Sequence, residues 1–358
     1  MRMIGIITQP LGYNYGGILQ NYALQRALKK LGYASITIDD AFRYSYARYL
    51  FSCMVTIVYK AIGKRRSFPL KPHMGRDIPS VTSRFIYDKI SIAKSYEGLT
   101  EKTMRKYGIT TIIVGSDQVW RPAYNASIYK MYLDCVSNGY KKIAYAASFG
   151  TEEWEYSKEQ TRKCSTLLQS FDGVSVREKS GINLVSKHLD YNSALLVLDP
   201  TLLLQKSDYI ELCNNTEKSL SKYLCAYVLD LSDEKRRIIQ EIALEKRLEV
   251  KMFSAHDNMS LTVEEWLDSF RNASFVITDS FHGTVFSIIF ERDFVVLQND
   301  ARGNDRFVSL LSSVGLSDRV YAQDRIMKDI DWNLVNNNVE LMRNASYSFL
   351  KSHLQVKS

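Results

Sequence analysis

Residues 3–38 read MIGIITQPLGYNYGGILQNYALQRALKKLGYASITI, and the order of the patterns in this stretch indicates the fold. A short apolar run over 3–8 ends in a loop that contains glycine and asparagine. Apolar residues then recur at helical spacing over 18–31, a glycine follows, and a β-branched run occupies 35–38. Strand, loop, helix and strand in this order predict a βαβ unit and therefore a parallel sheet.

The same alternation continues through most of the chain and predicts an α/β fold with parallel sheets. A length of 358 residues suits two domains better than one. We expect an N-terminal domain over 1–165, a C-terminal domain over 166–332 and a helical tail over 333–358. Further strands are expected at 109–114, 142–147, 173–176, 195–198, 224–229, 249–253, 275–278 and 294–297.

Composition limits the classes of protein that fit. The net charge of +8 favours anionic partners such as phosphates. The five cysteines form no C-x-x-C pair and no Cys/His cluster at ligand spacing, so we expect neither a disulfide framework nor a metal site. The sequence contains no run of about 20 apolar residues, so we expect no transmembrane helix. The apolar run at the N-terminus is too short for a signal peptide, so we expect a cytoplasmic protein.

The run 278–284, Thr-Asp-Ser-Phe-His-Gly-Thr, joins an apolar strand to an apolar helix. Such a turn presents free backbone N–H groups and the positive end of a helix, which bind phosphate or carboxylate. Gly283 permits close approach of the backbone, and His282 exchanges protons near neutral pH. A helix cap beside a surface histidine is the structural alternative. Because polar residues gather here between two buried elements, we favour a functional site.

Two other runs suit a sugar. Residues 13–21 form a glycine-containing loop that matches neither the dinucleotide-binding nor the P-loop pattern. We expect this loop to line a cleft, and a plain tight turn is the alternative. Residues 115–120 place the carboxylate of Asp117 and the ring of Trp120 after a buried strand. A carboxylate accepts hydrogen bonds from hydroxyls and an aromatic face stacks on a sugar ring, whereas an Asp helix cap is the alternative.

Two runs offer guanidinium groups. Arg177 directly follows a buried strand, where an arginine needs an anionic partner such as a carboxylate or a phosphate. A structural pair with Glu178 is the alternative. The loop 302–306, Arg-Gly-Asn-Asp-Arg, follows the strand expected at 294–297 and offers a second guanidinium.

Taken in order, these runs resemble the polysaccharide pyruvyl transferase family. The resemblance implies a fold like that of GT-B glycosyltransferases, with two Rossmann-like domains whose parallel sheets face each other across a cleft. It also implies phosphoenolpyruvate as donor and a pyruvate ketal on two sugar hydroxyls as product. The runs that carry the resemblance are 14–20, 114–120, 146–150, 176–181, 198–201 and 278–284.

The resemblance further implies where the substrates bind and which residues react. The acceptor belongs to the N-terminal domain, and the donor, which is a substrate and not a cofactor, belongs to the C-terminal domain. Members can carry an arginine where this chain has Ser280, so Arg306 or Arg302 is expected to supply the second guanidinium. His282 and Asp117 are the expected catalytic residues. The expected donor-binding residues are Arg177, Ser280, Phe281, His282, Gly283, Thr284 and Arg306, and the expected acceptor-binding residues are Asn14, Tyr15, Gly16, Gly17, Ser116, Trp120 and Ser148.

Residues 43–66 form a basic and aromatic stretch with an apolar centre over 49–62. The centre is too short to span a bilayer, but its flanks fit a helix that lies on an anionic membrane surface. An acceptor sugar on a polyprenyl lipid carrier would require such contact at the inner face of the membrane. A helix that packs on its own domain is the alternative.

Two rival functions remain at the level of sequence. A GT-B glycosyltransferase that uses a nucleotide sugar would share the fold. A non-catalytic carbohydrate-binding protein would use the same polar loops without turnover. We expect no nucleic-acid partner, because outside 43–66 the basic residues are dispersed rather than interleaved with aromatic residues.

Overall fold

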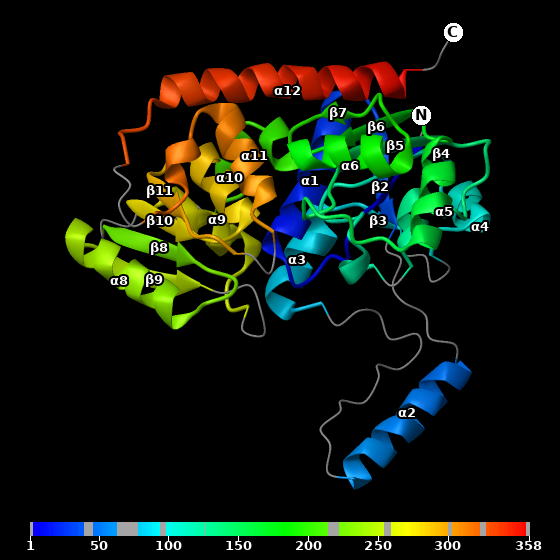
Figure 1. Cartoon of the computed structure of the whole chain (residues 1–358), viewed down its shortest axis with the longest axis horizontal. Coiled ribbons are helices and arrows are strands. Elements are labelled where there is room, and N and C mark those ends of the chain that lie inside the picture. The colour runs from blue at the N-terminus through cyan, green and yellow to red at the C-terminus, as the bar shows by residue number, and fades with distance from the viewer. Residues whose placement is uncertain are drawn as a thin grey trace.

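The computed structural model describes residues 3–38, 46–62, 78–93, 98–125, 127–213, 222–253, 259–299, 303–322 and 327–355. Two sheets, each with its own helices, lie next to each other in this structure (Figure 1). The first has seven strands in the order β3-β2-β1-β4-β5-β6-β7, and the second has four in the order β11-β10-β8-β9. Every strand pair in both sheets is parallel, which confirms the predicted α/β fold.

The strands coincide closely with the apolar runs of the sequence, since strands of parallel sheets are covered on both faces. The one strand that the sequence did not indicate is β3, which has only two residues. The strands of the first sheet are β1 (Met3–Ile7), β2 (Ala34–Ile38), β3 (Ile92–Ala93), β4 (Ile109–Val114), β5 (Lys141–Ala147), β6 (Gly173–Val176) and β7 (Leu195–Leu196). Those of the second are β8 (Tyr223–Tyr227), β9 (Glu249–Phe253), β10 (Phe275–Thr278) and β11 (Phe294–Val296).

Helices connect the strands as the alternation predicts. The helices associated with the first sheet are α1 (Tyr15–Lys30), α2 (Tyr46–Ala61), α3 (Ser80–Lys89), α4 (Glu101–Lys106), α5 (Lys158–Leu168) and α6 (Lys179–Leu189), with short 3₁₀ turns η1 (Pro122–Tyr124) and η2 (Ile128–Tyr132). After β7 come η3 (Pro200–Leu203), α7 (Lys206–Ile210), α8 (Asp233–Lys246), α9 (Val263–Arg271), α10 (Phe281–Ile289), α11 (Asp305–Val314), η4 (Ser317–Arg319) and α12 (Trp332–Leu354).

The two sheets divide later in the chain than the expected boundary at residue 165. β6 pairs with β5 and β7 pairs with β6, so both strands extend the first sheet although 166–332 was expected to form the second domain. The second sheet starts with β8. Strand patterns are alike in the two halves, and a pattern by itself does not say which neighbour a strand will pair with.

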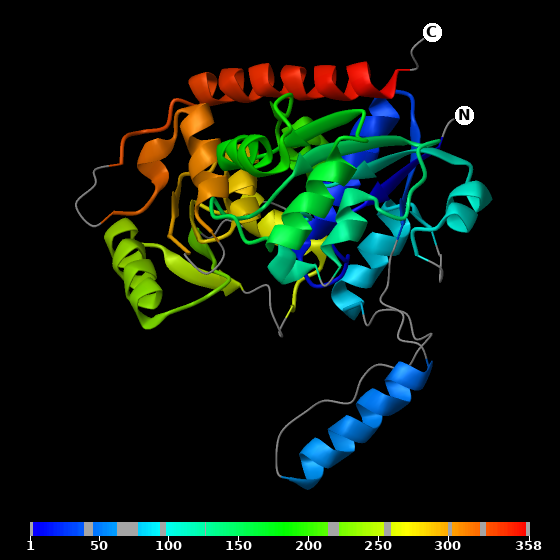
Figure 2. The same ribbon diagram turned by 45° about the vertical axis from the view of Figure 1, so that its right-hand side comes forward.

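Helix α1 lies between the two sheets (Figure 1) and helps to join them. It is buried along nearly its whole length, and the buried residues include the polar side chains of Gln20, Asn21 and Gln25. One continuous apolar cluster contains Tyr15 and Leu19 of α1 together with Trp266 of α9 and Phe286 of α10. Helix α12, the expected helical tail, lies along both units in Figure 2 and packs on α11 and η3. The two units therefore share a core.

Helix α2 stands clear of both sheets in Figures 1 and 2. Its exposed apolar residues recur three or four positions apart and form one stripe, and Thr56, on the opposite side, is buried. No helix in the described part of the chain combines the length and hydropathy needed to cross a membrane. Of the segment 43–66, the flanking residues Arg43, Lys64, Arg65 and Arg66 lie outside the described residues. The exposed apolar side chains on this stripe are Leu50, Phe51, Met54, Ile57, Val58 and Ile62, and the ring of Tyr59, to one side of the stripe, is also exposed.

Candidate active site

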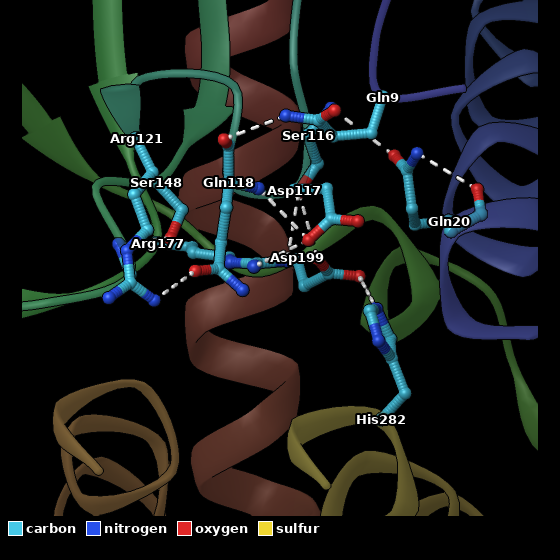
Figure 3. Close-up of polar contacts among 12 residues, drawn as sticks. Gln9, Gln20, Ser116, Asp117, Gln118, Arg121, Ser148, Arg177, Asp199 and His282 are labelled. Atoms are coloured by element: carbon cyan, nitrogen blue, oxygen red, sulfur yellow. Dashed lines mark hydrogen bonds and ion pairs between the residues drawn. The ribbon is translucent and has the colours of Figure 1, made fainter. Parts of the chain in front are cut away.

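Polar side chains meet where three strands of the first sheet end. Asp117 follows β4, Arg177 follows β6 and Asp199 follows β7. The carboxyl ends of parallel strands are where ligands bind in open α/β sheets. His282 reaches the same place from the second unit, because α10 points its first turn at these strand ends (Figure 3). The cluster therefore draws on both halves of the chain.

Arg177 forms the centre of the cluster, and its side chain is fully buried. Its Nη1 donates to Asp199 Oδ2 at 2.7 Å and its Nη2 donates to Asp117 Oδ1 at 3.1 Å. Its Nε has no hydrogen-bond partner and lies 3.8 Å from Glu178 Oε2. Burial alone would lower the pKa of Arg177, but the carboxylates of Asp117, Asp199 and Glu178 raise it above its ordinary value. The guanidinium is therefore charged and oriented, and its Nε–H makes no hydrogen bond.

The carboxylates respond differently to burial. Burial alone would raise the pKa of Asp117, but the positive charges of Arg177 and Arg306, together with that of His282 when its ring is protonated, hold this pKa below its usual range. Burial raises the pKa of Glu178 even though Arg177 opposes this effect. Asp117 is thus ionised in this arrangement, whereas Glu178 takes up a proton more readily than an exposed glutamate does.

His282 lies in the first turn of α10, which begins three residues earlier than expected because Ser280 serves as the N-cap and accepts from Gly283 N at 3.4 Å. Its Nε2 lies 3.8 Å from Asp199 Oδ1 and has no hydrogen-bond partner. Burial lowers the pKa of His282, and the carboxylates of Asp199 and Asp117 oppose this effect. The imidazole is therefore neutral near pH 7 and able to accept a proton.

Phe281 brings two guanidinium groups together. The Arg177 Cζ lies 4.6 Å from the centre of its ring and the Arg306 Cζ lies 5.9 Å from it, within the range of cation–π attraction. Burial, with the neighbouring charge of Arg177, lowers the pKa of Arg306 to about 10. An arrangement of two buried cations is stabilised by an anion between them. Arg306 therefore lies beside Phe281, the residue that follows Ser280, where some family members carry an arginine. Arg302 lies outside the described residues.

The predicted loop at the start of α1 meets the site at one residue. Gly16 packs on His282 so closely that a β-carbon there would lie 2.0 Å from the imidazole Nδ1. Gly17 faces the Asn14 side chain instead, and a β-carbon added at Gly17 would lie 3.4 Å from Asn14 Nδ2. Tyr15 is buried, donates to Leu261 O at 2.7 Å and stacks on Trp266. Tyr15 therefore joins the two units, and Gly16 touches the proposed base.

Trp120 does not offer a surface to a sugar. Its side chain is completely buried, stacks on Tyr132 and contacts Phe149. Its Nε1 donates to Met131 O at 3.1 Å. We therefore correct the sequence prediction, because an indole covered by neighbouring rings stabilises the core rather than a ligand. The ring of Tyr124 is 45% exposed, with the Arg121 Cζ 5.0 Å from its centre, so it offers more ring surface than Trp120 does.

The remaining predicted acceptor residues, Ser116 and Ser148, are both fully buried. Ser116 donates to Asp199 Oδ2 at 2.8 Å, and the Ser148 hydroxyl accepts from Gly150 N at 3.1 Å. They support the loops around the site. Thr284 is also buried and donates to Ser280 O at 3.0 Å within α10. In the described part of the chain no group of three or more His, Cys, Asp or Glu side chains is arranged to hold a metal ion.

Two acidic residues were not selected from the sequence. Asp199 joins the cluster, as described above, and the signal for it was the run Leu-Asp-Pro-Thr after a strand. Asp279 accepts from Leu229 N at 2.6 Å, from Lys235 Nζ at 2.6 Å and from Asn299 Nδ2 at 2.9 Å. It therefore ties the ends of β8 and β11 to the turn before α10 and holds the position of that helix.

The chain belongs to the polysaccharide pyruvyl transferase family, whose sequence model matches residues 14–301. It is accordingly a transferase. A search of curated protein sequences finds no significant match.

Among solved structures the chain is similar to a putative UDP-N-acetylglucosamine 2-epimerase from Listeria monocytogenes, with 10% identity, a TM-score of 0.50 and coverage of 98% of this chain and 90% of that one. It is also similar to the UDP-GlcNAc 2-epimerase of Methanocaldococcus jannaschii, with 14% identity, a TM-score of 0.43 and coverage of 96% and 93%. A Streptomyces sp. SF2575 glycosyltransferase gives 10% identity, a TM-score of 0.39 and coverage of 97% and 96%. The likeness to the structure from Listeria monocytogenes concerns the fold alone, which is GT-B-like.

Proposed function

We propose that this member of the polysaccharide pyruvyl transferase family transfers pyruvate from phosphoenolpyruvate to two hydroxyls of a sugar during surface polysaccharide biosynthesis. The observation that carries the proposal is the pair of buried cations, Arg177 and Arg306, over the ring of Phe281. His282 and the N-terminus of α10 lie beside them. A small dianionic or trianionic donor suits such a site.

Phosphoenolpyruvate carries a carboxylate and a phosphate close together, so each cation would face one of these groups. The free Nε–H of Arg177 offers one donor without breaking any existing hydrogen bond. The positive end of α10 favours negative charge at the same place. These features support a donor site on the boundary between the two units.

The reaction we propose proceeds in balanced steps. Protonation of the methylene carbon of the donor makes a methyl group, and one sugar hydroxyl bonds to the adjacent carbon. The carbon–oxygen bond to phosphate then breaks, and the second hydroxyl closes the ketal. Of the two hydroxyl protons, one replaces the proton added to carbon and the other leaves with phosphate. His282 and Asp117 are the groups proposed to move these protons.

Donor binding would also activate Asp117. Its pKa is held down by Arg177, with which it shares an ion pair of 3.1 Å. An anionic donor at Arg177 and Arg306 would offset this positive charge, so the pKa of Asp117 would rise. Asp117 would then accept a proton from a sugar hydroxyl more readily than it does in the free enzyme.

Release of inorganic phosphate from phosphoenolpyruvate tests the proposal. We expect release that depends on an added sugar acceptor, together with an acceptor product heavier by pyruvate less water in mass spectrometry. Reactions without acceptor, or with His282→Gln, serve as controls. Turnover of a nucleotide sugar with no phosphate release from phosphoenolpyruvate would instead establish a glycosyltransferase.

We propose in addition that α2 lies on an anionic membrane and brings the enzyme to an acceptor on a polyprenyl carrier at the cytoplasmic face. The support is the exposed apolar stripe over 50–62, with basic residues at 64–66 in the adjoining sequence. Such a helix buries its apolar face among lipid chains while the cations attract anionic headgroups.

Co-sedimentation with liposomes tests this role of α2. We expect the wild type to bind vesicles that contain anionic lipid and to bind neutral vesicles weakly. Phe51→Ser/Met54→Ser and Arg65→Glu/Arg66→Glu should each reduce binding. Leu244→Ser, at a leucine that is 78% exposed on α8, is the matched control and should bind as the wild type does. Equal binding by all four proteins would exclude α2 as the membrane contact.

A further inference from the structure

Asp199 is held in one orientation by four hydrogen bonds. Its Oδ1 accepts from the backbone N–H of Thr201 at 3.0 Å and from the Thr201 hydroxyl at 2.7 Å. Its Oδ2 accepts from Ser116 Oγ at 2.8 Å and from Arg177 Nη1 at 2.7 Å. The side chain is fully buried, so neither oxygen is free to turn toward solvent.

The same carboxylate faces the imidazole of His282. Oδ1 lies 3.8 Å from His282 Nε2, slightly beyond hydrogen-bond distance, and Nε2 has no other partner. At Nδ1 the ring meets the backbone of Gly16. Figure 3 shows His282 rising from α10 toward Asp199, which itself contacts Arg177.

We propose that Asp199 is a positioning residue that sets the tautomer and orientation of His282, favours its protonated form and holds the Arg177 guanidinium. Asp199 acts through these two side chains and is not itself a catalytic residue. The same arrangement, in which a buried carboxylate orients a histidine and stabilises its cation, recurs where histidine acts as a base. The importance of this role for catalysis rests on the proposed function, but the effect on His282 does not.

The electrostatics around His282 set the direction of the expected change. Asp199 and Asp117 face the ring and raise its pKa, whereas burial, Arg177 and Arg306 lower it. Removal of the Asp199 charge takes away one of the two groups that favour the imidazolium. The pKa of His282 should therefore fall further below its ordinary value in Asp199→Asn.

Histidine NMR measures this effect without any substrate. The chain has five histidines, and the resonance of His282 is identified by its absence from His282→Gln. In wild type we expect the neutral ring to carry its proton on Nε2, where Asp199 accepts it. A proton on Nδ1 would overturn the proposal, and this measurement requires no variant at Asp199.

Asp199→Asn and Thr201→Val separate charge from packing. We expect the His282 titration to move to lower pH in Asp199→Asn and not in Thr201→Val, which keeps the carboxylate but loses one hydrogen bond to it. An unchanged titration in Asp199→Asn, or an equal fall in both variants, would contradict the proposal.

Activity supplies the second readout. In Asp199→Asn we expect kcat/KM to fall by about 10-fold or more, and the limb of the pH profile that reports His282 to move to lower pH. If the NMR result holds but wild type releases no phosphate from phosphoenolpyruvate, the proposed function fails and the role of Asp199 stands.

Discussion

Gly16 and His282 touch across the boundary between the two units, because a β-carbon on Gly16 would lie 2.0 Å from the imidazole Nδ1. Gly16 belongs to α1 and His282 to α10, so the helix of the chain's first βαβ unit packs against the proposed base. The contact leaves no room for any side chain at position 16. The run at 13–21 therefore meets the site by direct packing of Gly16 on His282.

Gly16→Ala should therefore damage both catalysis and stability. The added methyl group has to displace the His282 ring, and we expect kcat/KM to fall by about 10-fold or more. Overpacking of this kind costs about 1–3 kcal/mol of unfolding free energy. Gly17→Ala is the matched control, since its β-carbon would meet Asn14 at 3.4 Å. Steady-state kinetics and thermal unfolding of both variants check the prediction, and equal activities would contradict it.

His282→Gln should lower kcat by about 10²- to 10⁴-fold, the range that general acid–base groups contribute. Folding should remain intact, because glutamine keeps a polar side chain of similar reach. Comparison of kcat with donor KM distinguishes loss of proton transfer from loss of binding. Full activity in this variant would remove His282 from the mechanism.

The stability of the protein should depend on pH through His282. Its pKa is lower in the folded chain than in the unfolded chain, where about 6.5 is ordinary. The unfolded state therefore binds more protons, so this contribution is fully present above about pH 6.5 and is lost as pH falls toward the folded-state pKa. Melting temperatures of wild type and His282→Gln should diverge between neutral and mildly acidic pH. Parallel curves would show that His282 is not buried in its neutral form.

Arg177→Lys should weaken both donor binding and stability. A lysine cannot bond Asp117 and Asp199 together as the planar guanidinium does, and a buried carboxylate that loses a hydrogen-bond donor destabilises the folded state. We expect a higher KM for phosphoenolpyruvate and a lower melting temperature. Arg105→Lys, on the exposed face of α4, controls for the substitution itself. An unchanged donor KM would remove Arg177 from the donor site.

Trp120→Phe should affect the core and leave the acceptor site alone. The indole is buried against Tyr132 and Phe149 and donates to Met131 O, so we expect a lower melting temperature. The acceptor KM should not change. Tyr124→Ala provides the contrast, because the Tyr124 ring is exposed and interacts electrostatically with Arg306, and its loss should raise the acceptor KM. The opposite outcome would restore Trp120 as a sugar platform.

Much of the fold was predictable because local pattern and final environment agree. The runs at 109–114, 173–176 and 275–278 become strands with the same bounds, since strands buried on both faces need largely apolar sequence. The sheet that each strand joins was not predictable in this way. β6 carries no local mark that distinguishes pairing with β5 from a place in the second sheet.

The residues of the site were likewise predictable from the sequence, but their contacts with one another were not. Polar residues after buried strands identified Asp117, Arg177 and His282, because strand ends of parallel sheets are where ligands bind. The pairing of Arg177 with two carboxylates, the contact of Gly16 with His282 and the burial of Trp120 depend on residues far apart in the sequence. No short window contains them.

The sequence by itself determined the parallel α/β architecture, the family and the turn at 278–284, since each depends on residue patterns within short segments. The tertiary structure decided that Arg177 belongs to the first sheet and that Asp199 stands between it and His282. The physical reason is that charge, burial and close contact act through space. A side chain acquires its pKa and its partners only when distant segments pack together.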